Sequence, residues 1–252
     1  MAHYKLILAY DGTRFLGYQR QGSKRTVQAE VEAALRKLGW EGRAVLSAGR
    51  TDTGVHASGQ VIAFDLEWAH GTAELHSAIN ANLPVDISVR EASETAERFH
   101  PRFDATARIY TYKVFSDEFR DPNREVQAWR IWPAPKFQLM EKASNLILGQ
   151  HDFRAFGSPM AKGESTERIV WSSRWDESAE DEWHYEIKAN AFLYHMVRRT
   201  VFLLARAGQG KVNLEDFASA VYTGKKIMPG LAPPNGLTLT RVEYGPEMQE
   251  KR

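Results

Sequence analysis

Apolar residues in the first half of the chain follow two different periods. Residues 3–10 place apolar side chains at every second position, which predicts a half-buried strand. Residues 27–38 carry an apolar stripe at helical spacing, between Thr26 as the N-cap and Gly39 as the stop, which predicts a helix. The same reasoning predicts further strands over 43–48, 60–67 and 87–89, and a shorter helix over 73–82.

The second half of the chain repeats this outline. Strands are predicted near 109–115, 126–132, 168–174, 183–188 and 237–244, and helices over 137–148, over 192–207 and from Asn213 to Gly224. Strands and helices do not alternate strictly, so an α+β fold with a mostly antiparallel sheet is favoured. No Gly/Ser-rich linker divides the chain. We therefore expect two similar halves, 1–104 and 105–252, that share one sheet flanked by helices.

Composition narrows the class of protein. Cysteine is absent, which excludes disulfides, thiolate metal sites, iron–sulfur clusters and a catalytic thiol. No apolar run approaches the roughly 20 residues that span a bilayer, and the first residues enter the first predicted strand without a signal-peptide pattern. These features lead us to expect a soluble cytoplasmic protein.

The net charge of +1 conceals a strong segregation of charge. Segments 14–25 and 188–211 are basic and contain no acid, and segment 98–113 contains Asp104 as its only acid, whereas acids gather over 176–182. A single basic run is explained by a solvated surface. Three such runs, which also carry aromatic residues, favour a polyanionic partner such as a phosphate backbone.

The stretch with the most chemistry is Ser47–Gln60, between two predicted strands. It carries Asp52 among hydroxyl groups, glycines and Arg50. Taken alone, the Thr51–Gly54 sequence is explained by an Asx or ST turn that joins two strands. The functional alternative is a single carboxylate that a nearby arginine holds ionised, acting as nucleophile or base.

This stretch also carries a family resemblance. Gly49-Arg50-Thr51-Asp52-Thr53-Gly54-Val55-His56-Ala57 resembles the signature loop of the TruA-type tRNA pseudouridine synthases. Further segments similar to that family, in the family's order, are Tyr10–Gln21, Thr26–Gln28, Asn82–Ile87, Phe99–Ala105, Arg108–Tyr112, His151–Phe153, Asn190–Arg198 and Asn235–Leu237. Three positions depart from the pattern without removing a reactive group: Tyr18 replaces Trp, Pro101 replaces a common Ala, and Phe202 replaces a small residue.

The resemblance implies an isomerase that needs no cofactor. Such an enzyme breaks the N1–C1′ bond of uridine and forms a C5–C1′ bond to the same base. Gly12 and Gly17 have the spacing of P-loop glycines, but Tyr18-Gln19 follows instead of Lys-Ser/Thr. The histidines show no HExxH pattern, so a zinc site is not expected.

Site residues follow from the same resemblance. Asp52 matches the catalytic carboxylate, which could attack C1′, add to C6 or remove the C2′ proton. Arg198 matches the arginine that pairs with this aspartate, although a helix arginine that snorkels at the surface has the same pattern. Tyr110 matches the tyrosine that stacks on the target base, although a core aromatic residue on an alternating strand has the same pattern.

Substrate-binding roles are implied for four further residues. Arg50 matches the residue that assists base flipping or fills the vacated space, and a simple phosphate contact is its alternative. Phe192 and Met196, with Leu193, would wall the pocket, and they would be equally at home in a helix core. The implied active-site cleft lies between the two halves.

The implied substrate is the anticodon arm of tRNA, at uridines 38, 39 and 40, recognised by shape, and the implied assembly is a homodimer. One alternative is a tRNA-binding protein or chaperone without catalysis. Asp52 argues against it, because an acid in an RNA-facing groove repels phosphate. A glycosidase-like hydrolase is a weaker alternative, because that chemistry uses two carboxylates around the bond and the signature loop holds one.

Overall fold

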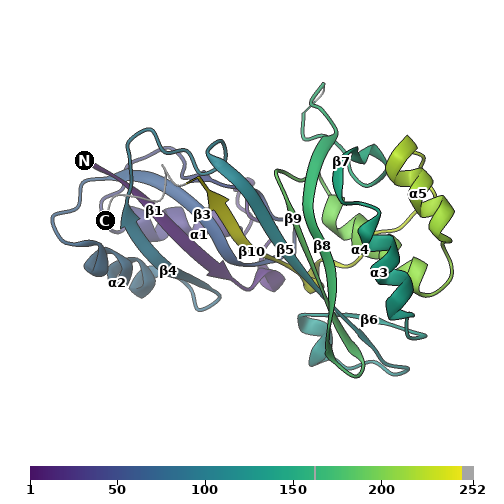
Figure 1. Cartoon of the computed structure of the whole chain (residues 1–252). Helices are drawn as coiled ribbons and strands as arrows, with labels where there is room; N and C mark the ends of the chain where they lie inside the picture. Colours follow the sequence, from purple (N-terminus) through teal and green to yellow (C-terminus); the bar gives the residue numbers. More distant parts are fainter. Residues whose placement is uncertain (162, 246–252) are drawn as a thin grey trace. The chain divides into compact units, whose positions relative to one another are not determined.

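The computed structural model describes residues 1–161 and 163–245 (Figure 1). Its strands are β1 (Ala2–Tyr10), β2 (Leu46–Ser47), β3 (His56–Leu66), β4 (Ile87–Glu94), β5 (Ala105–Ser116), β6 (Trp129–Ile131), β7 (Gly149–Asp152), β8 (Glu167–Ala179), β9 (Glu182–Ala189) and β10 (Leu237–Tyr244). Its α-helices are α1 (Val27–Arg36), α2 (Thr72–Asn82), α3 (Phe137–Asn145), α4 (Met196–Gly208) and α5 (Leu214–Thr223). None of these helices is long and apolar enough to cross a bilayer.

The strands form one ten-stranded sheet in the order β4-β1-β3-β10-β5-β9-β8-β7, with β2 on β3 and β6 on β5. Strand β1 pairs antiparallel with β3 and β4, and strand β9 pairs antiparallel with β5 and β8. Parallel pairing occurs between β10 and β3 and between β6 and β5. The predicted α+β fold with a mostly antiparallel sheet is thereby confirmed.

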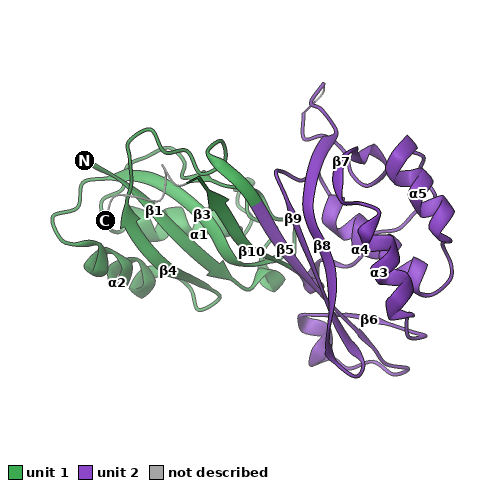
Figure 2. Ribbon diagram, viewed as in Figure 1, with its two compact units in different colours: residues 1–107, 238–252 green, residues 108–237 purple. Residues whose placement is uncertain are grey.

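The chain divides into two compact units (Figure 2). Unit 1 contains residues 1–107 together with the C-terminal segment from Thr238, and unit 2 contains residues 108–237. The predicted division placed the whole of 105–252 in the second half, and its residues 246–252 lie outside the described residues. Strand β10 instead joins unit 1, because Thr238 and Leu239 pair with His56 and Ala57 on β3. A parallel pairing this distant in sequence leaves no mark on local periodicity.

Unit 1 is built on β1 and α1 as their patterns predict. The alternate side chains of β1, from Tyr4 to Tyr10, are buried, and so is the apolar stripe of α1. Burying each large apolar side chain of this kind contributes about 1.5–3 kcal/mol. The Thr26 hydroxyl caps α1 by accepting a hydrogen bond from Ala29 N at 3.4 Å.

Unit 2 differs from its prediction at the start of α4. The apolar pattern predicted a helix from residue 192, but α4 begins at Met196. His195 has a φ of +65°, which an α-helix does not allow. Ser158 and Tyr194 also exchange two backbone hydrogen bonds, of 3.2 and 2.9 Å, so tertiary pairing holds Tyr194 outside the helix.

The structure also explains one departure from the family pattern. Phe202 is buried on α4, where its ring stacks on Trp129 with centroids 6.3 Å apart. Gly230 lies against this ring so closely that a Cβ there would approach it to 2.1 Å. The larger side chain is therefore accommodated by a glycine on a neighbouring loop.

Candidate active site

Asp52 lies in the connection between β2 and β3 in unit 1. Val55 N donates to the Asp52 carbonyl at 3.1 Å and Gly54 has a φ of +77°, so residues 52–55 close a tight turn. Thr51 is buried, whereas Asp52 is partly exposed. The turn that the local sequence predicts is therefore present, and it presents a carboxylate at the surface of unit 1.

The segment Gly12–Tyr18 lies against this turn. Tyr18 N donates to the Thr51 carbonyl at 3.1 Å. A Cβ at Gly12 would lie 2.0 Å from the Val55 carbonyl oxygen, so any larger residue would push the two segments apart. The opening motif and the signature loop, joined here by contacts between residues 33 or more positions apart in the sequence, thus form one packed feature.

Buried polar side chains lie behind the turn, and sequence reasoning did not single them out. The Tyr10 hydroxyl lies 2.8 Å from the Thr51 hydroxyl, and Gln60 donates to the Gly49 carbonyl at 2.9 Å. Burial raises the pKa of Tyr10 to about 12, against the opposing effect of hydrogen bonds with Thr51 and Gln60, so the phenol stays neutral at physiological pH. The signal in the sequence was a glutamine directly before the apolar run of β3.

The entry to β3 is held by His56 and Asp11. His56 Nδ1 lies 3.1 Å from both the Asp11 carboxylate and Gly12 N. Partial burial acts to raise the pKa of Asp11, but hydrogen bonds from Thr13 and the charges of His56 and Arg14 outweigh it and lower the pKa. Asp11 therefore stays ionised and fixes the first turn after β1.

In unit 2, Tyr110 lies on β5 opposite Ile187 of β9. Its ring meets Phe192 edge to face, with centroids 5.1 Å apart and planes at 88°. Both side chains are partly exposed. The structure therefore brings together two residues that the resemblance assigned to the base-binding pocket.

Phe192 belongs to a fixed loop and not to the helix. A Cβ at Gly157 would lie 2.7 Å from the Leu193 Cβ, so the 157–158 segment and the 192–195 loop pack directly on each other. Met196, the first residue of α4, is buried. Because this loop is closely packed, Phe192 is held in place for its contact with Tyr110.

Arg198 is anchored through both its side chain and its backbone. Its Nε donates to the Ala232 carbonyl at 2.8 Å, and Ala232 N donates to the Arg198 carbonyl at 3.3 Å. Burial raises the pKa of Tyr112 well above its usual value, and the charge of Arg198 opposes this shift. The guanidinium is therefore held in a defined position near the buried Tyr112.

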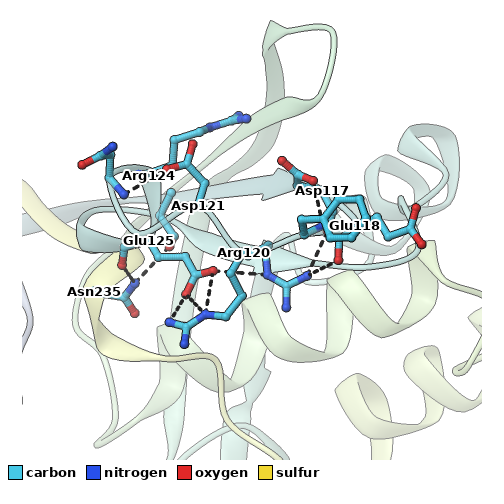
Figure 3. A network of polar contacts seen from close by, with 11 residues as sticks. Asp117, Glu118, Arg120, Asp121, Arg124, Glu125 and Asn235 are labelled. Atoms are coloured by element: carbon cyan, nitrogen blue, oxygen red, sulfur yellow. Dashed lines mark hydrogen bonds and ion pairs between the residues drawn. The ribbon is translucent and has the colours of Figure 1, made fainter.

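The segment that anchors Arg198 is itself fixed. The Tyr112 hydroxyl donates to the Pro233 carbonyl at 2.7 Å. Asn235 Nδ2 donates to the Glu125 carbonyl at 2.6 Å and to the Ala128 carbonyl at 2.9 Å, which ties this segment to the loop between β5 and β6 (Figure 3). Arg198 is thus bound to a segment that Tyr112 and the loop between β5 and β6 hold in place.

The predicted site residues fall in both units. Unit 1 carries Arg50 and Asp52 on one connection, and unit 2 carries Tyr110, Phe192, Met196 and Arg198 on β5, the 192–195 loop and α4. Within residues 1–161 and 163–245, no group of three or more His, Asp or Glu side chains is placed to hold a metal ion.

Comparisons with known proteins define the class. A family model described as tRNA pseudouridine synthase matches residues 6–104 and 143–245. Asp52 lies in the first matched segment, Arg198 lies in the second, and Tyr110 lies between them. The class is therefore that of the pseudouridine synthases, which are isomerases.

Relatives agree over the whole length. Proteins named tRNA pseudouridine synthase A are 38% identical in Listeria monocytogenes serotype 4a (strain HCC23), over 97% of this chain and 100% of the relative, and 37% identical in Citrifermentans bemidjiense, over 97% and 98%. The relative from Pseudothermotoga lettingae is 35% identical over 97% of this chain and 100% of its own. The chain belongs to the tRNA pseudouridine synthase family, and the predicted family and enzyme class are confirmed.

Proposed function

We propose that this protein isomerises uridine to pseudouridine at positions 38, 39 and 40 in the anticodon arm of tRNA, with Asp52 as the catalytic nucleophile or base and without a cofactor. The observation that carries the proposal is the placement of Asp52 on the fixed 52–55 turn, inside the first family-matched segment. A carboxylate that is partly exposed on a rigid turn suits attack on a sugar carbon or a base carbon.

The other predicted residues receive roles within this proposal. Tyr110 stacks on the target base and Arg198 is the arginine of the site. The edge-to-face contact of Tyr110 with Phe192 and the anchoring of Arg198 on Ala232 support these roles, because both side chains are held in place before any substrate arrives. Arg50 is exposed near Asp52, and we assign it to base flipping or to a phosphate contact.

The cellular setting belongs to the same proposal. We propose a cytoplasmic homodimer in which basic surface holds the tRNA. The basic segments 14–25, 98–113 and 188–211 support a polyanionic substrate, because closely spaced cations attract a phosphate backbone.

Site-resolved pseudouridine mapping tests the activity. Unmodified tRNA with uridines in the anticodon arm is incubated without cofactor with the wild type, with Asp52→Ala and with Asp176→Ala. Asp176 is the matched control, since it is an exposed acid on β8 that takes no part in the proposed site. We expect new pseudouridine at 38 to 40 with the wild type and with Asp176→Ala, and none with Asp52→Ala.

Binding is measured in the same tRNA samples. Unchanged binding by Asp52→Ala together with lost activity assigns the carboxylate to the chemistry. Binding by the wild type without isomerisation of any suitable tRNA contradicts the proposal and favours a tRNA-binding protein or chaperone.

A further inference from the structure

The turn that carries Asp52 is supported by buried polar side chains. Tyr10, Thr51 and Gln60 are all buried, with 5%, 7% and 0% of their surface exposed. Buried polar groups of this kind are costly unless they are satisfied by hydrogen bonds, so their presence behind an otherwise apolar strand calls for an explanation.

Their hydrogen bonds lead to residues just before Asp52 in the chain. The Tyr10 hydroxyl lies 2.8 Å from Thr51 Oγ1, one residue before Asp52. Gln60 donates to the Gly49 carbonyl at 2.9 Å, and its own Oε1 accepts from Val61 N at 3.2 Å. The tyrosine and the glutamine, on adjacent strands β1 and β3, therefore grip both ends of Gly49–Thr51.

Backbone contacts alone fix only part of the turn. Tyr18 N holds the Thr51 carbonyl at 3.1 Å, and Val55 N holds the Asp52 carbonyl at 3.1 Å. Both bonds act on main-chain carbonyls, so neither holds the side chain of Thr51. The Tyr10–Thr51 hydrogen bond holds that side chain as well, directly before Asp52 in the chain.

We propose that Tyr10 is a positioning residue for catalysis: its hydroxyl, through Thr51, orients the Asp52 carboxylate toward the substrate. This inference rests on the proposed catalytic role of Asp52. A misplacement of about 1 Å in a catalytic group can lower the rate about a hundredfold. Loss of one buried hydrogen bond next to the carboxylate is therefore expected to slow the chemistry and to leave tRNA binding intact.

The chain offers a matched control for this hydroxyl. Tyr185 in unit 2 is also buried, and its hydroxyl lies 2.7 Å from the Ser173 hydroxyl. Tyr185→Phe and Tyr10→Phe each remove one buried hydroxyl from a tyrosine–hydroxyl pair. The two changes should lower the melting temperature to a similar degree, and only Tyr10→Phe should change the rate.

The test measures kcat, KM and the tRNA Kd with bulk unmodified tRNA, so the readout does not depend on which uridine reacts. For Tyr10→Phe we expect kcat to fall at least about tenfold, with KM and Kd within about twofold of the wild type. In Thr51→Val, which removes the partner hydroxyl, kcat should fall by the same factor. Thr51→Ser, which keeps that hydroxyl, should retain most of the rate, and the Tyr10→Phe, Thr51→Val double variant should be no slower than either single variant.

Two results overturn the inference. One is a wild-type kcat in Tyr10→Phe, and the other is an equal loss of kcat in Tyr185→Phe, which would mean general loosening of the fold. If the wild type forms no pseudouridine, the proposed function fails. Hydrogen exchange of residues 49–60 then still tests whether the Tyr10 hydroxyl holds the turn in place. Faster exchange of these residues in Tyr10→Phe than in Tyr185→Phe supports the role of the Tyr10 hydroxyl in holding the turn. Equal exchange in the two variants contradicts that role.

Discussion

Two loops of this protein are held in place by different means. The connection that carries Asp52 in unit 1 is fixed from beneath by neutral, buried groups, chiefly the Tyr10–Thr51 pair. The 117–128 loop in unit 2 is held by ion pairs at its surface, beside the hydrogen bonds that Asn235 donates to it (Figure 3). Its central contacts join Arg124 to Asp181 at 2.9 Å and to Glu182 at 3.1 Å, with the Arg124 side chain 29% exposed.

The difference teaches what each loop tolerates. Water and salt weaken exposed ion pairs, so such a loop gains little stability from each pair and adapts to its surroundings. A buried hydrogen bond between neutral groups is indifferent to salt, and leaving one partner unsatisfied costs more. A loop that must hold one reactive carboxylate in place is better served by the second arrangement.

The sharpest way to break the comparison is to force the Asp52 turn away from its support. In Gly12→Ala the new Cβ would lie 2.0 Å from the Val55 carbonyl oxygen, so we expect a loss of about 3 kcal/mol in the free energy of unfolding. Gly49→Ala is the control in the same connection, because a Cβ there meets nothing within 4 Å. Urea denaturation of both variants checks this, and equal stabilities would contradict the packing described for the turn.

Alkaline pH should release the buried network on which the turn rests. The folded-state pKa of Tyr10, about 12, lies above its unfolded value of about 10. The stabilisation is therefore complete below pH 10 and is lost as the pH rises through 12, by about 2.7 kcal/mol in all. Between pH 10 and pH 12, the free energy of unfolding of the wild type should fall more steeply than that of Tyr10→Phe. Parallel curves would show that the pKa of Tyr10 is not raised in the folded state.

Removing the central cation of the 117–128 loop should have a smaller effect. Arg124→Gln is expected to cost about 1 kcal/mol at neutral pH, the upper end for partly exposed pairs. The hydrogen bond from Arg124 lowers the pKa of Asp181, so this stabilisation is present above pH 4 and is lost as the pH falls through the lowered value. Melting temperatures of the variant and the wild type should converge in acid. Arg120→Gln, which removes a more exposed arginine, serves as the control and should change the melting temperature less.

Salt should change the hydrogen-exchange rate of one loop and not of the other, and this is the smallest of the expected effects. At about 1 M salt the screening length falls to about 3 Å, so the ion pairs of the 117–128 loop weaken. Hydrogen exchange of peptides from this loop should become modestly faster, whereas exchange of residues 49–55 should not change. A salt-dependent rate in both peptides would show that the Asp52 turn also depends on charge.

Local sequence predicted most of the elements that build these loops. The alternation of β1 and the stripe of α1 are short-range patterns, because side-chain burial within one strand or helix repeats with a fixed period. The Thr51–Gly54 sequence likewise predicted a turn, since glycine supplies the positive φ that the turn requires. Strand β7 was missed, because four residues led by Gly149 and three polar residues carry no apolar alternation.

Where the prediction failed, distant partners decided the outcome. Helix α4 starts at Met196 although the apolar period begins at Phe192, because Ser158 takes the backbone groups of Tyr194. No residue near 192 in the sequence indicates that Ser158 will pair with the backbone of Tyr194.

By itself, the sequence determined the α+β class, because that class depends on local periods, and the family, because the family's motifs occur in order along the chain. The site residues are predictions that follow from the family resemblance. Only the tertiary structure decided that β10 completes unit 1, that Gly12 lies against Val55, and that Tyr10 lies behind Thr51. These contacts join residues separated by about forty positions or more, and their free energy is gained only when the folded chain brings the partners together.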